Sequence, residues 1–570
     1  MREGRNVEKM HFIISQTMMK YYHDQRSRYA MARHVALASR LVKSKVEERR
    51  GYRKILWDAG ETAAQSGARP TALWYFRHCV DLLQDDPWNE DHPDTYYDET
   101  LRLYVATADM IWLQGHNMEA MNLLDAVFVH GRTPVCRSKA WVVKAKIYAQ
   151  MGHHPNAMSC LLTCLEELGV YLRSATTYEQ CDIVYKKLRK HIWETDFDRL
   201  VHIPICHDDE MVTIGEVMSE AMVVTFWDDA LTFYQMALEM MNLHLSKGGF
   251  DQISVACSHL AMIALGRFKD LEFAVKLTDL GVSLFGNCLD PFTQSRATVT
   301  HNLFVSHLRV PIASTLPILE NSLEESFAMG DPYLSLCNVC CMATTRLYLG
   351  HDMLQLELFC DEGPEDYPSW KNDTRVGVCV LATRQVLPLD AVYPVTARLT
   401  RIYYRQVARA LQGKTYYWDP ESIMSDEWHR SWELFSFLDK HASNVDRPRV
   451  FYWGLAMIPL FIFGHHRKII EMGTQIMRSI SKLWSVRVAY CIHFYVALSY
   501  LTLHVDNPHL EFFDGEMDII LNHKEAIDFA RSACDVNYGM WALLLEALMC
   551  EMRKDYATAI QSFEVGIPMR

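Results

Sequence analysis

The sequence predicts an all-α fold made of antiparallel helix pairs, and three observations carry that prediction. Glycine (25 residues) and proline (19 residues) are scarce for a chain of 570 residues, which disfavours an architecture of many short strands and turns. Apolar residues make up half of the chain and recur at helical spacing. Small residues recur in a fixed pattern around turn-forming glycines. The length suits several domains or one elongated array of helices.

The first fifty residues are predicted to form an amphipathic helical segment with a basic outer face. Residues 1–50 contain twelve Lys or Arg against five Asp or Glu, in a chain of net charge −13, so the remainder carries −20. We expect the apolar face of the run YAMARHVALASRLV to pack on the following helix pair. An anionic membrane or an acidic partner is the alternative target of the basic residues, which are Arg26, Arg28, Arg33, Arg40, Lys43, Lys45, Arg49 and Arg50. The acidic remainder excludes nucleic acid as the main partner.

An acidic stretch lies between the first two predicted helix pairs. Residues 81–100 contain eight Asp or Glu and no Lys or Arg. Because charged and turn-forming residues gather in surface connections, we predict a solvated loop between helices. A cation site or an acidic docking loop is the alternative interpretation.

A spacing of small residues occurs three times in the first third of the chain. In each copy a small residue precedes a glycine by seven positions, an alanine follows the glycine by five, and a large apolar residue follows the alanine by four. A glycine lets the chain reverse, and facing small residues let two helix axes approach closely. This pattern resembles the tetratricopeptide repeat, which implies a solenoid, a superhelix of antiparallel helix pairs. The three copies consist of Gly60, Gly67, Ala72 and Phe76; of Ala108, Gly115, Ala120 and Leu124; and of Ala145, Gly152, Ala157 and Leu161.

The repeat spacing drifts along the chain. The turn glycines are 48 and 37 residues apart, whereas tetratricopeptide repeats recur at roughly 34 residues. A degenerate fourth copy stands near residue 570, where Ala547, Ala559 and Phe563 keep the spacing and Lys554 takes the place of the turn glycine. The pattern therefore predicts a repeat array that runs with drift through most of the chain.

Two further helix pairs and two seams are predicted between these copies. Apolar periodicity on either side of Gly266 and of Gly350 indicates helix, turn and helix. Pro, Gly and acidic residues cluster at 202–211 and at 361–373, which indicates breaks within one solenoid. We therefore predict four parts: a basic helical segment at 1–50, tetratricopeptide-like repeats at 51–200, degenerate helical repeats at 211–360, and degenerate repeats ending in a tetratricopeptide-like pair at 374–570.

One stretch is similar to the box around the phosphate-accepting histidine of histidine kinases. The run LFVSHLRVPIAST places Ser306, His307, Arg309 and Pro311 in a similar order. The acid that follows the histidine in that box, and would act as its general base, is replaced by Leu308, and the arginine comes one residue early. The chain also contains no G-x-G for an ATP lid. We therefore predict a structural histidine near a helix end, with Pro311 opening the next helix.

A second incomplete motif is the end of a phosphate-binding loop. Gly413, Lys414 and Thr415 match its last three positions, but Ala408 stands where the loop needs its first glycine. A helix end with Gly413 as its cap is the better interpretation.

Metal-binding patterns are incomplete as well. Cys337 and Cys340 form one C-x-x-C on an apolar helix, without the second Cys or His pair of a zinc site. Two histidine pairs follow turn glycines and are interpreted as exposed loop residues, namely His153 with His154 and His465 with His466. We expect no metal, no cofactor and no catalytic residue in this chain.

Cysteine usage and hydropathy predict a cytoplasmic protein without a membrane span. Sixteen cysteines are scattered through apolar runs, as expected for reduced and buried thiols. The start MREGRNVEKM lacks the apolar core of a signal peptide. The uncharged stretch at residues 450–464 is too short to cross a bilayer and is predicted to form a buried helix with a proline kink.

Four longer stretches resemble the helical-repeat region of large fungal hybrid histidine kinases: RYAMARHVALASRLVK, GARPTALWYFRHCVDLLQDDPW, HASNVDRPRVFYWGLAMIPLFIFG and LWSVRVAY. In that family a protein-kinase-like domain and a P-loop ATPase-like domain precede this region, and a sensory domain, a histidine kinase core and a receiver follow it. The resemblance implies phosphorelay signalling as the context. It carries over no catalytic residue, because the matching stretches contain none.

Together these observations predict a non-catalytic scaffold or coupling module for protein–protein or interdomain interaction. Its concave surface would hold a peptide, a neighbouring domain of a larger kinase or a second copy of the chain. One alternative is a fragment of a hybrid histidine kinase with kinase and ATP-binding activity that uses His307. Another is a truncated gene product that binds the full-length kinase.

Overall fold

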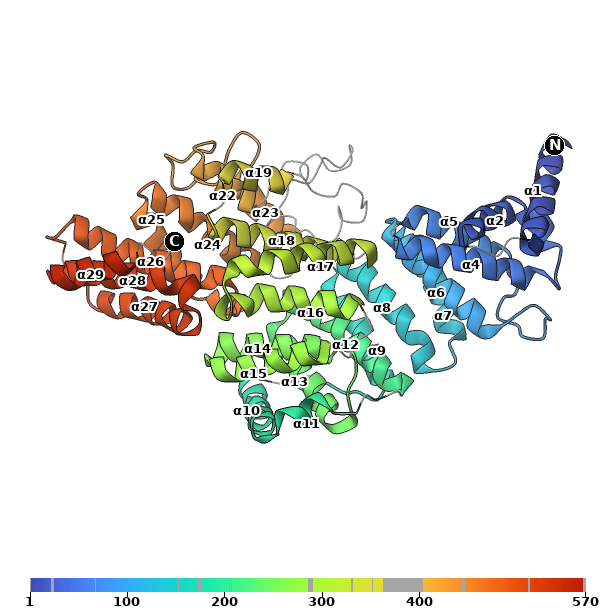
Figure 1. The fold of residues 1–570 in the computed structure, drawn as a ribbon, viewed down its shortest axis with the longest axis horizontal. Helices are drawn as coiled ribbons and strands as arrows, with labels where there is room; N and C mark the ends of the chain where they lie inside the picture. The colour runs from blue at the N-terminus through green and yellow to red at the C-terminus, as the bar shows by residue number, and fades with distance from the viewer. Residues whose placement is uncertain are drawn as a thin grey trace. The chain divides into compact units, whose positions relative to one another are not determined.

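A computed structural model gives the fold of the chain (Figure 1). It describes residues 2–21, 25–66, 68–151, 153–172, 177–204, 206, 208–285, 291–329, 332–350, 352–361, 403–441, 446–510 and 513–566. These ranges contain 27 α-helices and no β-strand, apart from a single bridge at Gly249. The predicted all-α class is confirmed. The described residues form two compact units, and each unit is described by itself. Unit 1 contains those within 1–171 and 326–332, and unit 2 contains the others.

Unit 1 contains nine helices, most of which pack in sequential pairs. Helix α4 packs on α5, α6 on α7, and α8 on α9. The helices are α1 (Arg2–Tyr21), α2 (Gln25–Leu37), α3 (Ser39–Lys43), α4 (Arg49–Gln65), α5 (Arg69–Asp81), α6 (Tyr97–Leu113), α7 (Asn117–His130), α8 (Pro134–Gln150) and α9 (His154–Glu167). These three pairs coincide with the three copies of the small-residue pattern.

The small residues of the pattern lie where paired helices approach each other. The five alanines of the three copies are fully buried. A Cβ atom added at Gly60 would lie 2.5 Å from Cε1 of Phe76, so only glycine allows α4 and α5 to pack this closely. The predicted close contact between helices is therefore confirmed.

The turn of the α6–α7 pair has the predicted glycine geometry. Gly115 has φ +84°, and its amide donates to Trp112 O over 2.8 Å. The next amide, of His116, reaches back to Ile111 O over 3.2 Å. This pair of bonds is the Schellman motif, which satisfies the last carbonyls of a helix. The other two turn glycines, Gly67 and Gly152, lie outside the described residues.

The fourth copy forms the same turn without glycine. Lys554, between α28 and α29, has φ +63°, and its amide donates to Glu551 O over 2.9 Å. Asp555 N donates to Cys550 O over 2.8 Å, which completes the same motif. The prediction that Lys554 occupies the turn position is confirmed.

We expect Lys554→Gly to stabilise unit 2 by about 0.5–1 kcal/mol. A lysine in the left-handed conformation costs about 1–2 kcal/mol, and glycine removes this cost. Glycine also loses more backbone entropy on folding, which offsets part of the gain. Urea unfolding followed by circular dichroism measures the change. Lys554→Ala is the matched control, since it removes the same charge and keeps the strained backbone. Equal stability of the glycine and alanine variants would contradict the explanation.

The basic segment at 1–50 is helical, as predicted, but it is divided into several helices and does not form one amphipathic helix. It forms α1, α2, α3 and the first turn of α4. Its apolar side packs as predicted, because Ala32, Val35 and Val42 share a core with Leu56 and Phe76 of the first pair. Arg49 departs from the predicted charged outer face, since its side chain is buried.

The acidic stretch is a loop between α5 and α6, but part of it is not solvated. Asp94 is only 3% exposed and binds the guanidinium groups of Arg49 and Arg53 on α4. Asp85, by contrast, is fully exposed. The prediction of a solvated loop is therefore wrong at Asp94, which joins the loop to the first helix pair.

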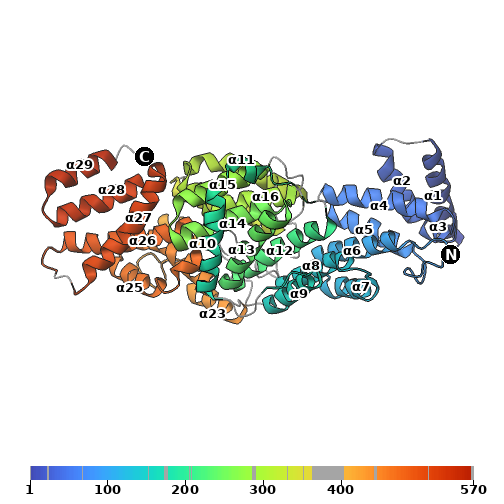
Figure 2. The same ribbon diagram turned by 90° about the horizontal axis from the view of Figure 1, so that it is seen from below.

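The later helices, most of which belong to unit 2, also pack in sequence. Helix α14 packs extensively on α15, α26 on α27, and α28 on α29. The four helices from α26 to α29 lie beside one another in Figures 1 and 2. The elements are α10 (Tyr178–Glu194), α11 (Phe197–Val201), α12 (Asp209–Asp228), α13 (Ala230–Lys247), α14 (Ile253–Phe268), α15 (Leu271–Phe285), α16 (Pro291–Phe304), η1 (Ser306–Leu308), η2 (Ile312–Thr315), α17 (Leu316–Met329), α18 (Pro332–Tyr348), α19 (Met353–Asp361), α22 (Tyr403–Leu411), α23 (Ser431–His441), α24 (Asp446–Ile462), α25 (His466–Ile476), η4 (Ile480–Leu483), α26 (Arg487–Asp506), α27 (Glu516–Ala533), α28 (Asp535–Met552) and α29 (Tyr556–Gly566).

Of the turns and seams predicted among these later helices, one turn and one seam agree with the structure. Gly350 has φ +69° and stands between α18 and α19, as predicted. Gly266 lies inside α14, and the turn comes at Lys269, which has φ +53°. The seam at 202–211 matches the connection from α11 to α12, whereas the seam at 361–373 lies outside the described residues after Asp361.

Helix α26 is the one described helix whose length and composition would allow it to cross a membrane. In the structure, 72% of its apolar window is buried. It packs on α24, α25, α27 and α28, as the core helix of a helical unit does. The uncharged stretch at 450–464 forms the buried helix α24 with Pro459 inside it, as predicted.

Candidate functional site

His307 is a buried structural residue. It lies in η1, is 3% exposed, and forms hydrogen bonds through both ring nitrogens. Nδ1 lies 2.6 Å from the hydroxyl of Tyr538, and Nε2 lies 2.7 Å from the carbonyl oxygen of Ser485. Because a carbonyl can only accept, Nε2 carries the proton and Nδ1 accepts from Tyr538. Each nitrogen that could attack a phosphate is thus already engaged.

The surroundings of His307 also hold it neutral. Burial lowers its pKa to about 3, and the nearby charge of Arg487 acts in the same direction. The following residues support this role, since Asn537 Nδ2 donates to the carbonyls of His307 and Val310 over 2.7 and 2.8 Å. Pro311 precedes η2, which leads into α17. The residue therefore joins η1 to α28 and to the turn between η4 and α26, and the prediction of a structural histidine near a helix end is confirmed.

The residues that match the end of a phosphate-binding loop, Gly413 to Thr415, form a helix end, as predicted. Gly413 has φ +71° directly after α22, and its amide donates to Ala410 O over 2.9 Å. Lys414 Nζ binds Glu357 Oε2 over 2.7 Å, and Thr415 Oγ1 donates to Ile423 O over 2.7 Å. The side chains that would bind phosphate and magnesium in a true loop are engaged within the protein.

The cysteine and histidine candidates are not brought together. Cys337 and Cys340 are buried free thiols on α18, and no group of three or more His, Cys, Asp or Glu side chains in the described ranges is placed to hold a metal ion. His153 is exposed, but His154 is buried at the start of α9, which corrects its expected place in an exposed loop. The second pair, His465 and His466, is half-buried.

A surface that no sequence motif marks lies in the connection between α22 and α23 and in the first turn of α23, where Trp432 stands. Residues 412–432, here called the tryptophan connection, contain three tryptophans that are 62–65% exposed: Trp418, Trp428 and Trp432. Large aromatic side chains are normally buried to a high degree, so three exposed indoles within fifteen residues are unusual. Their clustering in a connection rich in acids was visible in the sequence, but their exposure was not.

Hydrogen bonds within the tryptophan connection hold its backbone. Tyr416 N donates to Ser425 O over 3.0 Å, and Asp426 N donates to His429 O over 2.8 Å. From outside, His465 Nε2 donates to Tyr417 O over 2.9 Å. These bonds make the connection a folded loop with a defined path.

A buried ionic network fixes the base of the connection. Arg409 of α22 binds Glu357 of α19 over 2.7 Å and Asp426 over 2.9 Å. Gln406 Nε2 also donates to Asp426 over 3.1 Å. Burial opposes ionisation of Asp426, but the hydrogen bonds it accepts and the charge of Arg409 bring its pKa below the ordinary value. The network therefore ties an acidic loop to two helices beneath it.

Acidic side chains outnumber basic ones on the outer side of the tryptophan connection, where Arg430 is exposed as well. Glu421 and Glu427 are exposed, and Asp419 and Glu433 are half-buried. Glu421 also binds Lys468 of α25 over 2.5 Å. The surface thus combines flat apolar rings with negative charge, which suits a partner that carries cationic side chains.

A second open surface lies on α4 and α6 of unit 1. It encloses about 460 Å³ and includes Trp57, over which the guanidinium of Arg102 lies at 4.2 Å from the ring centroid. Arg53 and Glu99 beneath it bind each other over 2.9 Å. Because its one indole is buried and its inner charges are paired, this surface offers less binding energy than the tryptophan connection.

Comparison with known proteins assigns no family: no protein-family model and no curated protein matches the sequence.

Proposed function

We propose that this chain is a non-catalytic helical-repeat scaffold, a tetratricopeptide-like solenoid that binds a protein partner through the tryptophan connection. The observation that carries the proposal is the presence of three largely exposed tryptophans on one hydrogen-bonded connection. Tryptophan is among the residues that contribute most to protein–protein binding energy. A loop that is already ordered also loses little conformational entropy when it binds.

The chemistry of the surface favours a basic polypeptide segment as the partner. Cationic side chains stack on indole rings, and the exposed Glu427 adds complementary charge at the rim. Such a segment could belong to a separate protein or to another domain of a larger kinase. The resemblance of the repeat motifs to hybrid histidine kinases supports phosphorelay signalling in the cytoplasm as the setting.

The competing proposal is a kinase fragment that accepts phosphate on His307. The burial of this side chain and its bonds to Tyr538 and Ser485 favour the scaffold. Incubation with labelled ATP and an active histidine kinase distinguishes the two. Acid-labile label on His307 would overturn the non-catalytic proposal.

We expect replacement of Trp418, Trp428 and Trp432 by alanine to weaken binding of an arginine-rich peptide at least tenfold, because the rings that stack on guanidinium groups are lost. The free energy of unfolding should change by less than about 1 kcal/mol, since the rings are largely exposed. Isothermal titration calorimetry measures the affinity, and urea unfolding measures the stability.

Two controls sharpen this experiment. Trp74→Ala removes a tryptophan of unit 1 that is 37% exposed, and it should leave the affinity unchanged. A peptide with glutamate in place of arginine should not bind. If the triple variant bound the arginine-rich peptide as well as the natural chain does, the tryptophan connection would not be the binding surface.

A further inference from the structure

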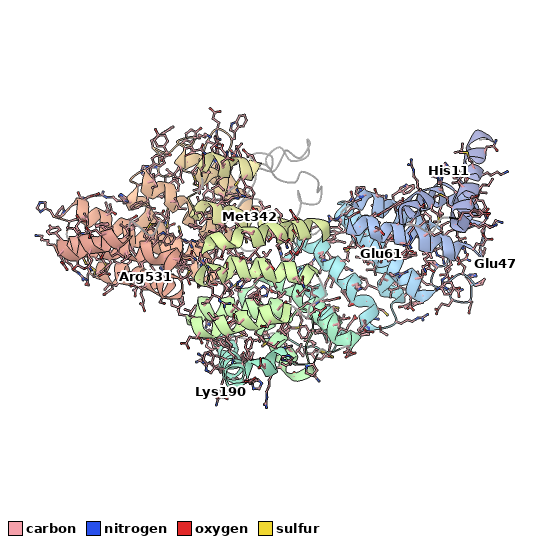
Figure 3. The ribbon with its side chains drawn as sticks, viewed as in Figure 1. His11, Glu47, Glu61, Lys190, Met342 and Arg531 are labelled. Carbon is pink, nitrogen blue, oxygen red and sulfur yellow. The ribbon has the colours of Figure 1, made fainter. Side chains whose placement is uncertain are left out.

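A mainly apolar cavity of about 110 Å³ lies inside unit 2. Its walls come from α12, α14, α16, α18, α22, α24 and η4, and α18 is the helix that carries Met342 in Figure 3. Large apolar side chains supply most of the lining, including Met222, Phe226, Leu303, Phe304 and Phe451. An apolar cavity of about 150 Å³ holds benzene, so this one has room for at most a single ring.

Two buried polar groups line the cavity without a partner. The hydroxyl of Tyr403 and Nδ1 of His259 have no hydrogen-bond partner among the described residues. Tyr403 is fully buried and His259 is 7% exposed. Buried polar atoms are nearly always hydrogen-bonded, so two unsatisfied groups around one cavity indicate a site that a ligand can complete.

Both groups are neutral. Burial raises the pKa of Tyr403 well above its ordinary range, and burial together with the charge of Arg296 lowers the pKa of His259 to about 3. The cavity therefore offers a hydroxyl that can donate or accept and a neutral imidazole. A ligand that meets them needs a hydrogen-bonding group and no charge.

The charged side chains around the cavity are engaged with the protein. Arg296 donates to Ser219 Oγ over 2.8 Å and to Glu220 over 3.2 Å. Lys482 binds Asp446. Arg447 Nε donates to the carbonyl of Lys482 over 2.9 Å, and its guanidinium lies 4.3 Å from the ring centroid of Phe226. Each of these cations is thus held by groups of the protein, two of them by carboxylates, which argues against an ionic ligand.

We propose that this cavity binds a small uncharged molecule of one ring that carries a hydroxyl group, with Tyr403 and His259 as its hydrogen-bonding partners. The apolar walls supply the affinity, and the two polar groups select a hydroxylated ring over a plain hydrocarbon of the same size. This binding site lies within the helical core and is independent of the tryptophan connection.

Phenol is the probe, with toluene as the apolar control and benzoate as the charged control. We expect phenol to bind the full chain in calorimetry and to raise its unfolding temperature. Toluene should bind at least fivefold more weakly, and benzoate should not bind. The same affinity for phenol and toluene would overturn the assigned hydrogen bonds, and the absence of phenol binding would overturn the site.

Tyr403→Phe tests the assigned contact. It removes an unpartnered buried hydroxyl, so the chain should fold, and we expect phenol affinity to fall about tenfold while toluene affinity stays the same. Tyr185→Phe is the matched control, because the Tyr185 hydroxyl is also buried with no hydrogen-bond partner in the described ranges but lies outside the cavity lining. Val299→Leu places a larger side chain in the cavity, and it should weaken the binding of both phenol and toluene. Unchanged phenol binding in Tyr403→Phe would contradict the proposal.

Discussion

At pH 5 we expect unit 2 to be less stable than at pH 7.5 by several kcal/mol, because four buried histidines are neutral in the folded state. Burial lowers the pKa of His259 and His307 to about 3 and that of His244 and His523 to about 4. All four side chains are less than 9% exposed. In the unfolded chain a histidine titrates near pH 6.5.

The sign of the effect follows from proton binding. Between pH 6.5 and the folded value, the unfolded chain binds a proton at each histidine and the folded chain does not. The stability that the four neutral histidines allow is fully present above pH 6.5, and it is lost as the pH falls toward 4. At pH 5 each histidine costs about 2 kcal/mol, and four together cost roughly 8 kcal/mol, which is comparable to the whole stability of a typical domain.

His244→Leu isolates one of these contributions. Both ring nitrogens of His244 are buried and have no hydrogen-bond partner within the described part of the chain, and the side chain is 1% exposed. Leucine fills a similar volume and cannot be protonated, so we expect it to stabilise the chain at pH 5 by about 2 kcal/mol relative to the natural residue. Urea unfolding at pH 7.5, 6 and 5 measures how steeply the free energy of unfolding depends on pH in each protein.

The matched control is His509→Gln, which replaces an exposed histidine of unit 2. It should leave the dependence of the unfolding free energy on pH unchanged. If His244→Leu showed the same dependence as His509→Gln, the buried imidazole would not be a source of the acid sensitivity.

Features that depend on neighbouring residues could be predicted from the sequence. The role of His307 followed from the missing acid at Leu308, and the cap at Gly413 followed from the missing glycine at Ala408. The turn at Lys554 followed from spacing, because Lys554 precedes Ala559 by five positions, as the turn glycine Gly115 precedes Ala120. Each of these predictions rests on residues within one or two helical turns.

Features that depend on distant contacts could not be predicted. Gly266 has the composition of a turn, yet its place in α14 allows close packing, since a Cβ atom there would lie 3.1 Å from the backbone of Trp484. The partners of His307 lie 178 and 231 residues later in the chain. Nothing within the local sequence specifies these contacts.

The candidate binding surface shows the same limit. The sequence places Trp418, Trp428 and Trp432 within fifteen residues, but tryptophan is highly buried on average, so their exposure cannot be read from the sequence. Their exposure is set by Asp426 and Arg409, whose contacts fix the path of the loop. Only the packed structure distinguishes an anchor in the core from a binding surface.

Asp94→Asn should destabilise unit 1 by about 3–5 kcal/mol, because it leaves two buried guanidinium groups with too little negative charge. Arg53 binds both carboxylate oxygens of Asp94 over 2.7 and 3.1 Å, and Arg49 binds the same carboxylate. All three side chains are nearly fully buried. Glu99, which binds Arg53 over 2.9 Å, would remain as the one carboxylate of this network.

Urea unfolding at pH 7.5 measures this loss, and Glu119→Gln is the matched control. Glu119 binds Arg77 over 2.7 Å with both side chains nearly half exposed, and such a pair contributes about 0–1 kcal/mol. The two variants remove one carboxylate charge each and differ mainly in burial. If Asp94→Asn lowered the free energy of unfolding no more than Glu119→Gln does, water would be replacing the lost carboxylate. The acidic loop would then not be held on α4 by charge.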